Sequence, residues 1–373
     1  MERQQAIARR IHAQQLDRPP AARPVTDAAV LDLGVQDTGR DGASWALVNR
    51  GVPVASPAAL ESDPSLALVW TLRSAPHYYR RADLPDVAVA TSPFSERDAA
   101  KRVLGAEKPL ADAGVAPRQG LAEVASRLRE VVVEPLAKGE VSTRVSALLD
   151  EPYLRDCVSC AAHHPWEVPF RVGALYGGLE LVPGTSPPVL RRIPDWPRSD
   201  WGPAEDPLAA PERLQVVRGY LRLLGPATVK DVAAFLDSPV AEVKAHWPED
   251  AERVDVAGRE AWVLPGGEAA APDDELVRLL GPFDLLLQGR DRDLLVPDRD
   301  RHRALWPTLG RPGAVLAGTE LVGTWRPRAA GSRLTVRLAA WSALTPRVRA
   351  RVGEEAERLA AHRGLQLVGV EEE

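Results

Sequence analysis

One segment decides the fold class: residues 211–264, PERLQVVRGYLRLLGPATVKDVAAFLDSPVAEVKAHWPEDAERVDVAGREAWVL. Its apolar residues recur at helical spacing until Gly225-Pro226, which ends a first helix. Thr228 lies three residues before Asp231, a spacing typical of a capped helix start, so a second helix follows. The turn at 237–239 then opens a third helix that carries Val243 and Trp247.

Two short apolar stretches follow these helices, at 254–256 and 261–264, and they are joined by a turn that contains Gly258. They predict a pair of antiparallel strands. Three helices followed by a hairpin are typical of a winged helix, which is a helix-turn-helix with a β-wing.

The same order of elements recurs twice upstream. In 120–194 we expect a long helix up to Val132, a break at Gly139, a short helix capped at 142–143, a third helix over 165–176 and wing strands at 179–182 and 189–193. In the N-terminal part we expect helices at 4–16, 28–33 and 42–49, a strong strand at 66–72 and a return strand at 77–81.

The C-terminal part has a different pattern. Apolar stretches at 284–288, 314–317, 320–325 and 334–338 predict strands, and 346–362 predicts a final helix. The sequence therefore predicts an α+β chain of three tandem winged-helix units and a small C-terminal β-barrel-like domain. The expected boundaries are 1–96, a linker at 97–118, 119–200, 211–266 and 275–373.

Composition excludes several classes of protein. The 373 residues carry 47 Lys and Arg against 52 Asp and Glu, a net charge of −5, which excludes a uniformly basic coat but leaves room for a local basic groove. The wealth of arginine fits phosphate binding and high-GC coding bias equally well. No apolar run approaches the length of a membrane span, and the N-terminus lacks the apolar region of a signal peptide. We expect a cytoplasmic protein.

Familiar chemical motifs are missing. The sequence has no P-loop, no G-x-G-x-x-G, no G-x-S-x-G and no H-E-x-x-H. Cys157-x-x-Cys160 precedes His163-His164, but these residues span only 157–164, whereas zinc fingers separate their ligand pairs by a dozen residues or more. We therefore expect two buried cysteines near the start of a helix, no metal and no cofactor.

Basic and aromatic residues gather on the proposed wings. They indicate contacts with a DNA backbone, with a solvated hairpin as the alternative. The polar run 36–42 between two expected helices has the composition of a solvated turn. The residues that we single out for DNA contact are Arg40, Trp45, Arg73, His77, Tyr78, Arg80, Arg81, Arg191 and Arg192.

Four stretches, in this order along the chain, resemble the AlkZ/YcaQ-type winged-helix DNA glycosylases. They are Leu33-Gly-Val-Gln-Asp-Thr38, Trp70-Thr-Leu-Arg-Ser-Ala-Pro-His77, Phe170-Arg-Val-Gly-Ala-Leu175 and Gly281-Pro-Phe-Asp284, and the strand at 323–325 is similar to the C-terminal part of that family. The resemblance implies a concave surface for duplex DNA. It also implies monofunctional excision of bulky or crosslinked N7-alkylated purines, such as the adducts of DNA-alkylating antibiotics. The biological role is either general repair or self-resistance of an antibiotic producer, and the sequence leaves both open.

The family carries a catalytic Gln-x-Gln or Gln-x-Asp motif in its N-terminal unit. Gln36 matches the first position, but Thr38 stands at the third and the acid, Asp37, comes one residue early. An N7-alkylated purine is a cationic leaving group, so the enzyme needs to hold a water near C1′ and stabilise an oxocarbenium-like sugar. Our hypothesis is that Asp37 activates the water, Gln36 positions it and Thr38 supplies a second hydrogen bond.

We expect an open site, because full extrusion of a bulky adduct into a tight pocket is costly. We also expect a monomer, since a lesion has no palindromic symmetry, acting on damaged double-stranded DNA at the nucleoid. The alternatives are a non-catalytic DNA-binding regulator, because winged helices are common in transcription factors, and a catalytically inactive scaffold.

Overall fold

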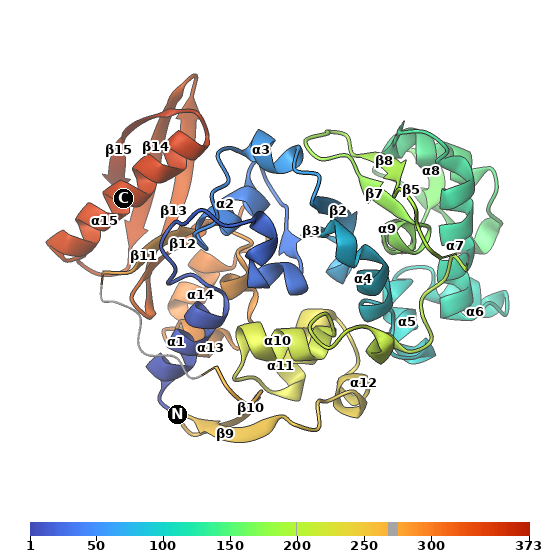
Figure 1. The fold of residues 1–373 in the computed structure, drawn as a ribbon. Coiled ribbons are helices and arrows are strands. Elements are labelled where there is room, and N and C mark those ends of the chain that lie inside the picture. The colour runs from blue at the N-terminus through green and yellow to red at the C-terminus, as the bar shows by residue number, and fades with distance from the viewer. Residues whose placement is uncertain (199, 268–274) are drawn as a thin grey trace.

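The computed structural model describes residues 1–198, 200–267 and 275–373, and it shows an α+β chain (Figure 1). The first third contains α1 (Arg3–Ala13), β1 (Val35–Gln36), α2 (Gly42–Val48), α3 (Pro57–Glu61), β2 (Leu66–Trp70), β3 (Pro76–Arg80), α4 (Leu84–Ala90), α5 (Glu96–Arg102) and α6 (Glu107–Asp112). The expected helix at 28–33 is replaced by two short 3-10 turns, Val25–Asp27 and Ala29–Asp32.

The middle of the chain contains α7 (Pro117–Val131), β4 (Leu136–Ala137), α8 (Lys138–Ser146), β5 (Leu154–Cys157), β6 (Ala162–Pro165), α9 (Glu167–Tyr176), β7 (Leu179–Leu181) and β8 (Val189–Arg192). The long helix α7 ends at Val131, before the break expected at Gly139, and Gly139 lies in the first turn of α8, which begins before the expected cap at 142–143. The hairpin β5–β6 is an insertion that the periodicity of the sequence did not predict.

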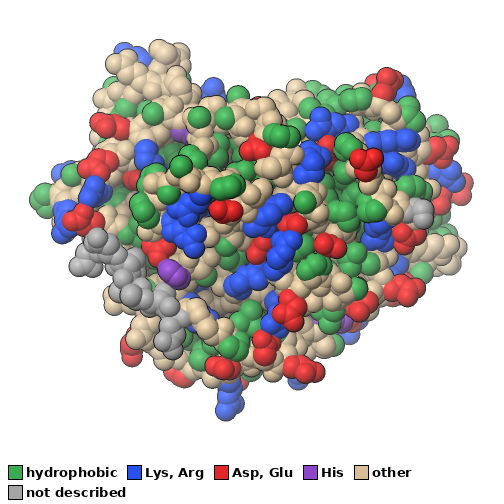
Figure 2. All heavy atoms as spheres, in the orientation of Figure 1, with side chains coloured by type: hydrophobic (Ala, Val, Ile, Leu, Met, Phe, Trp, Pro, Cys, Tyr) green, Lys and Arg blue, Asp and Glu red, His purple; other side chains and the backbone are tan. Residues whose placement is uncertain are grey.

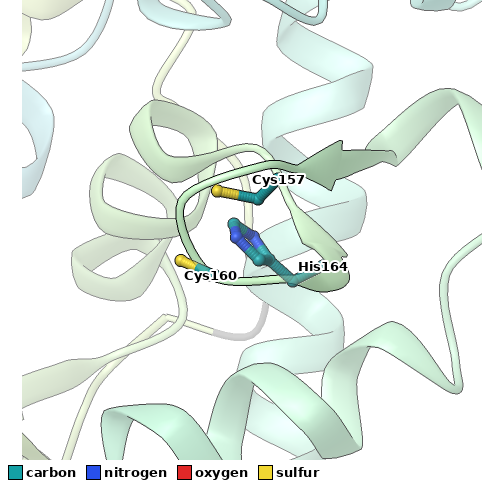
Figure 3. A group of neighbouring side chains, drawn as sticks. All are labelled: Cys157, Cys160 and His164. Atoms are coloured by element: carbon teal, nitrogen blue, oxygen red, sulfur yellow. The ribbon is translucent and has the colours of Figure 1, made fainter.

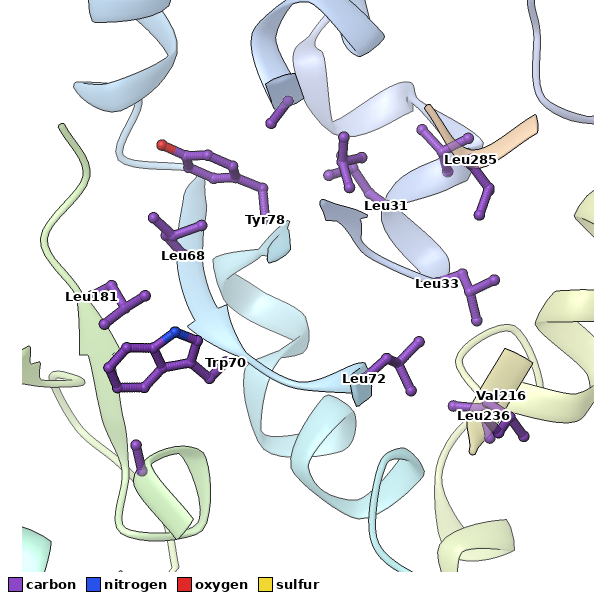
Figure 4. Packing of buried hydrophobic residues seen from close by; sticks show 14 of the residues in the cluster. Leu31, Leu33, Leu68, Trp70, Leu72, Tyr78, Leu181, Val216, Leu236 and Leu285 are labelled. Atoms are coloured by element: carbon purple, nitrogen blue, oxygen red, sulfur yellow. The ribbon is translucent and has the colours of Figure 1, made fainter. Parts of the chain in front are cut away.

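Strands of the first two predicted units form one sheet. Its order is β1-β3-β2-β7-β8-β4, and β2 joins β7 where Leu68 pairs with Leu181. Figure 4 shows Leu68 and Trp70 of β2 beside Leu181. All of β2 is buried, as its unbroken apolar sequence requires of a central strand. The expected boundary between the units therefore crosses a shared core.

The segment 211–264 has the predicted order of elements. It contains α10 (Val216–Leu224), α11 (Val229–Leu236), α12 (Val240–Ala245), β9 (Glu252–Val256) and β10 (Arg259–Val263). The capping box is present, because Thr228 accepts a hydrogen bond from Asp231 and Asp231 accepts one from Thr228. Ala227 also bridges to Trp262, which places the linker between α10 and α11 beside the wing.

The C-terminal part contains β11 (Val277–Leu280), α13 (Arg292–Leu295), α14 (Asp300–Leu305), β12 (Gly313–Ala317), β13 (Glu320–Ala330), β14 (Arg333–Ala340), α15 (Pro346–His362) and β15 (Gln366–Glu372). The five strands form a sheet in the order β11-β12-β13-β14-β15, with α15 packed against it (Figure 1). The sheet is open, so the expectation of a barrel was wrong. The strand expected at 284–288 is a 3-10 turn, because Asp284 caps it by accepting from Leu286 N.

The first helices of the chain are tied to this C-terminal part. Ile7 and Ile11 of α1 share a core with Leu280 and Leu286. Two buried ion pairs cross the same boundary, Arg10 with Asp291 at 2.5 Å and Arg50 with Asp284 at 2.8 Å. The N-terminal segment is therefore held by residues 234 and 281 positions away in the sequence. In the described parts of the chain, no helix has both the length and the apolar character to span a bilayer.

Candidate nucleic-acid interface

Gln36 and Thr38 lie at the end of β1 and point to the same side. The Gln36 Nε2 donates to Thr38 Oγ1 at 2.9 Å, and Arg73 Nη2 lies 3.5 Å from Gln36 Oε1. Residues two apart on an extended chain share a face, so this contact follows from the backbone geometry. Both side chains are half-buried. The structure thus brings together two of the three residues singled out as catalytic.

Asp37 points elsewhere. Its Oδ1 accepts a hydrogen bond from Ala43 N at 3.2 Å, in the first turn of α2. Burial raises the pKa of Asp37, and the nearby carboxylates of Glu61 and Asp41 add to this rise. The carboxylate therefore fixes the start of α2 and lies on the other face of the strand from Gln36. This geometry does not support the hypothesis that Asp37 activates the water.

Arg73 connects this pair to a distant segment. It donates to Gln288 Oε1 at 2.5 Å and to Phe235 O at 2.9 Å, and its guanidinium stacks over the Phe235 ring. Its backbone adopts the left-handed region with φ 55°, a conformation that costs about 1–2 kcal/mol for a residue with a side chain. Burial, helped by the charge of Arg290, lowers the pKa of Arg73 to about 10. Strain and like charge concentrated at one position are typical of a binding site.

Three further arginines, from the C-terminal part of the chain, extend this positive charge: Arg290 and Arg311 lie near Arg73, and Arg292 lies near those two. The pKa values of Arg292 and Arg311 are lowered by burial and by the charge of Arg290. Arg292 stacks on Trp306 and Arg311 on Phe283. None of the four forms an ion pair with an acid among the residues that the structure describes. We call Arg73, Arg290, Arg292 and Arg311 the arginine cluster.

A cavity of about 400 Å³ lies beside this cluster and is lined by residues from several segments between Thr71 and Arg290. Arg73 and Arg290 border it together with Lys101 and Arg102. Of these, Arg102 is neutralised by Asp98 at 3.2 Å. Asp237 also borders the cavity, but Arg73, Arg290 and Lys101 form no ion pair in the described chain, and such an excess of positive charge favours phosphate binding.

Three of the four arginines expected on the wings at 80–81 and 191–192 pair with carboxylates of the protein. Arg80 pairs with Asp32 at 2.5 Å, and both Arg81 and Arg191 pair with the buried Glu180 at 3.0 and 2.9 Å. Arg192 is exposed and donates to the backbone carbonyls of Val132 and Arg129. Basic and acidic side chains are interspersed over the face shown in Figure 2. These four arginines therefore connect segments of the protein to one another through ion pairs and hydrogen bonds.

The aromatic and imidazole groups expected at the interface lie in the core. Trp45, His77 and Tyr78 are each 2% exposed. Trp45 Nε1 donates to Leu279 O at 2.6 Å, and burial lowers the pKa of His77 to about 3. We therefore withdraw the expected DNA contacts of these three residues. Arg40 is exposed beside the Gln36–Thr38 turn and remains available.

Sequence reasoning missed Gln288 and the three C-terminal members of the arginine cluster. Gln288-Gly289-Arg290-Asp291-Arg292 follows, after three leucines, the Gly281–Asp284 stretch that carries the family resemblance. This polar run could have indicated a binding segment from the sequence. We instead expected a strand at 284–288, where the structure has a 3-10 turn. Only the chain's long-range contacts place it beside Gln36.

The two cysteines were also placed wrongly. They lie on the β5–β6 hairpin and not near the start of a helix, and Cys160 is exposed while Cys157 is buried. Cys157, Cys160 and His164 turn toward one another at the closed end of the hairpin (Figure 3). A hydrogen bond from Ser159 is the main cause that holds the pKa of the Cys157 thiol below its usual value.

Comparisons with known proteins identify the family and the fold. The model of the family "DNA glycosylase AlkZ-like" matches residues 30–362. The fold is similar to that of Streptomyces sahachiroi DNA glycosylase AlkZ, with a TM-score of 0.73, 21% sequence identity and 100% of each chain covered. No functionally curated protein matched the sequence.

Proposed function

The chain belongs to the AlkZ-like DNA glycosylase family, and from this premise we propose that it excises bulky N7-alkylated purines from duplex DNA. Family membership makes the protein a DNA glycosylase, which decides against the regulator alternative. Base release in the experiment below separates an active enzyme from an inactive scaffold of the same family. The substrate class rests on one observation in particular. The Gln36–Thr38 pair lies half-exposed beside the arginine cluster, where no acid is paired with the arginines in the described parts of the chain.

The chemistry requires little acid catalysis from the protein. An N7-alkylated purine carries a positive charge, so it leaves as a neutral base when the bond between N9 and C1′ breaks. A water oxygen then bonds to C1′, and its proton passes to solvent. In this scheme the Gln36 carboxamide accepts a hydrogen bond from the water, and its amide group is held in place by Thr38. Fixed polar groups of this kind stabilise the charge that develops in the transition state.

Asp37 has a positioning role in this proposal. Its bond to Ala43 N fixes the turn between β1 and α2, and this turn carries Thr38. The arginine cluster holds the phosphates on either side of the damaged nucleotide. The half-exposed setting of Gln36 suits a bulky adduct, since such an adduct need not enter a closed pocket.

The finer architecture and setting are part of the same proposal. We read 1–96, 119–200 and 211–266 as three winged-helix units around a concave DNA surface, working as a monomer at the nucleoid in the cytoplasm. Excision of antibiotic adducts in self-resistance is the biological role that this substrate class supports.

The test is base release from duplex oligonucleotides that carry one lesion, either N7-methylguanine or a bulky N7 adduct of a natural product. Alkali cleaves the abasic product, and the strands are separated by size. We expect release of both bases under single-turnover conditions. Release of the methylated base without the bulky one would contradict the proposed substrate class and leave the family assignment intact.

A further inference from the structure

The hairpin β5–β6 carries a cluster that base excision does not use. The ligand atoms of Cys157, Cys160 and His164 all lie within 4.8 Å of one another. In a tetrahedral zinc site, bonds of about 2.3 Å to sulfur and about 2.0 Å to nitrogen bring the ligand atoms to roughly 3.5–3.8 Å apart. A contraction of about 1 Å in the exposed turn is enough to reach that geometry.

The register of the hairpin explains why these three side chains meet. Asp156 pairs with His163, and Arg155 pairs with His164. Side chains alternate between the two faces of a strand, so Cys157 and His164 share one face and His163 lies on the other. His163 contacts Asp156 Oδ1 at 2.9 Å and is turned away from the sulfurs. The turn 158–161 then brings Cys160 back over the face of Cys157 (Figure 3).

The imidazole of His164 is oriented as a metal ligand. Its Nδ1 lies 2.7 Å from Pro165 O, so Nδ1 carries the proton and Nε2 presents its lone pair. Histidines that bind metals characteristically donate their second ring nitrogen to a carbonyl or carboxylate in this way, which fixes both tautomer and ring orientation. This second observation is independent of the distance between the three ligand atoms.

The hairpin has little else to hold its closed end. Val158 is 96% exposed, and residues 159–162 are also exposed. A two-stranded hairpin is marginally stable in water without further support. Strands of four residues each with an exposed tip therefore gain most from a crosslink at that tip.

Solvent can complete the coordination. A cavity of about 680 Å³ lies between the hairpin and α8, bordered by Cys157, Cys160 and His164 on one side and by Ser142 and Ser146 of α8 on the other. From the ligand set, its register and the imidazole orientation, we propose that Cys157, Cys160 and His164 bind one Zn²⁺, which fixes the closed end of the hairpin. The fourth position is taken by a water from this cavity. Two thiolates and an imidazole are a donor set that favours zinc over Mg²⁺ or Ca²⁺.

The first test is metal content. Full-length protein without a histidine tag is purified under reducing conditions, supplied with Zn²⁺, freed of excess metal by gel filtration and analysed by mass spectrometry. We expect about one zinc per chain. Cys160→Ser and His164→Ala should lose it. His163→Ala is the matched control, because the neighbouring imidazole is outside the cluster, and it should keep the zinc.

Cobalt substitution tests the ligands directly. The chain has only two cysteines, so a sulfur-to-cobalt charge-transfer band in the near ultraviolet reports on Cys157 and Cys160 alone. We expect this band together with the visible bands of tetrahedral Co²⁺, and both should disappear in Cys160→Ser. A chelator should lower the melting temperature of the wild type and of His163→Ala but not of Cys160→Ser.

Three outcomes overturn the proposal. One is a fully reduced protein that binds no zinc and gives no cobalt band. Another is a Cys157–Cys160 disulfide that returns after reduction even when zinc is present, which makes the pair a redox dithiol. The last is zinc that persists in both Cys160→Ser and His164→Ala, which places the metal elsewhere.

Discussion

Gln36→Ala is the substitution that most directly examines the catalytic geometry. It removes the amide that donates to Thr38 at 2.9 Å and the carbonyl that lies 3.5 Å from Arg73. The stability lost with one such hydrogen bond is about 1 kcal/mol. The catalytic loss is larger, because removing one preorganised polar group from a transition state costs about 2.7–4 kcal/mol, or about 10²–10³ in rate. We expect that decrease in single-turnover excision, with duplex affinity almost unchanged.

Asp37→Asn provides the matched comparison. Asparagine keeps an oxygen that can accept from Ala43 N, so the start of α2 stays fixed while the charge is lost. A charge near a helix N-terminus contributes about 0.3–1 kcal/mol to stability. We therefore expect excision to change by less than about fivefold, since a loss of 1 kcal/mol corresponds to about that factor.

The assay is release of N7-methylguanine from a duplex oligonucleotide with enzyme in excess. Fluorescence anisotropy measures duplex affinity, and circular dichroism checks the fold. If Asp37→Asn abolishes excision while Gln36→Ala stays within fivefold of the wild type, the carboxylate is the water activator and the geometric reasoning fails. That result would support Asp37 as the residue that activates the water.

The remaining predictions concern the third motif position at Thr38, the arginine cluster, and two buried side chains, His77 and Asp284. Thr38→Asp restores the Gln-x-Asp motif and keeps an acceptor for Gln36, so its single-turnover rate of excision should exceed that of the wild type. If Thr38→Asp is slower than Thr38→Val, which has no acceptor, Gln36 and Thr38 do not act as a pair. The salt slope of duplex binding is the change in log K per log salt concentration, and Arg290→Ala should lower its magnitude by about one. Arg191 is paired with Glu180, so Arg191→Ala should leave the slope unchanged. Equal effects of the two variants in a KCl titration would contradict this contrast. His77 has a pKa of about 3 in the folded protein against 6.5 ordinarily, so the unfolded chain binds the proton first and stability is lost as pH falls from 6.5. Urea unfolding should show a loss of about 2 kcal/mol at pH 5 that His77→Asn lacks, and identical pH profiles would refute it. Asp284→Asn leaves Arg50 buried without its anion and should lower the free energy of unfolding by about 3–5 kcal/mol; a loss under about 1 kcal/mol would show that water reaches the pair.

Local patterns allowed several elements to be predicted well. The capping box at Thr228, the glycine turn at Gly258 and the long final helix all depend on neighbours within a few residues, and the structure confirms them. The triplet at Gln36 was singled out from its resemblance to a family motif, and its catalytic role stays a prediction. These features share short-range causes: hydrogen bonds, turn geometry and helical periodicity act over adjacent residues.

Charge partners could not be predicted in the same way. From the sequence, Arg80, Arg81 and Arg191 were predicted to bind phosphates. In the folded protein each of them forms an ion pair with a carboxylate. The half-buried cations without an ion pair in the described chain belong to Arg73 and to a segment more than 200 residues later. Whether an arginine is free to bind DNA depends on its spatial neighbours, and a single sequence does not state them.

The sequence by itself determined the α+β class, the winged-helix order of residues 211–264, the family and the identity of the Gln36–Thr38 triplet. Only the tertiary structure decided which residues of that triplet face the arginine cluster, because the strand's alternation turns Asp37 toward α2 and Gln36 toward Arg73. In the tertiary structure, strands of two predicted units also form one sheet, and the predicted C-terminal barrel is an open sheet. The physical reason is that burial and strand pairing join residues distant in sequence, whereas propensity and capping act between neighbours.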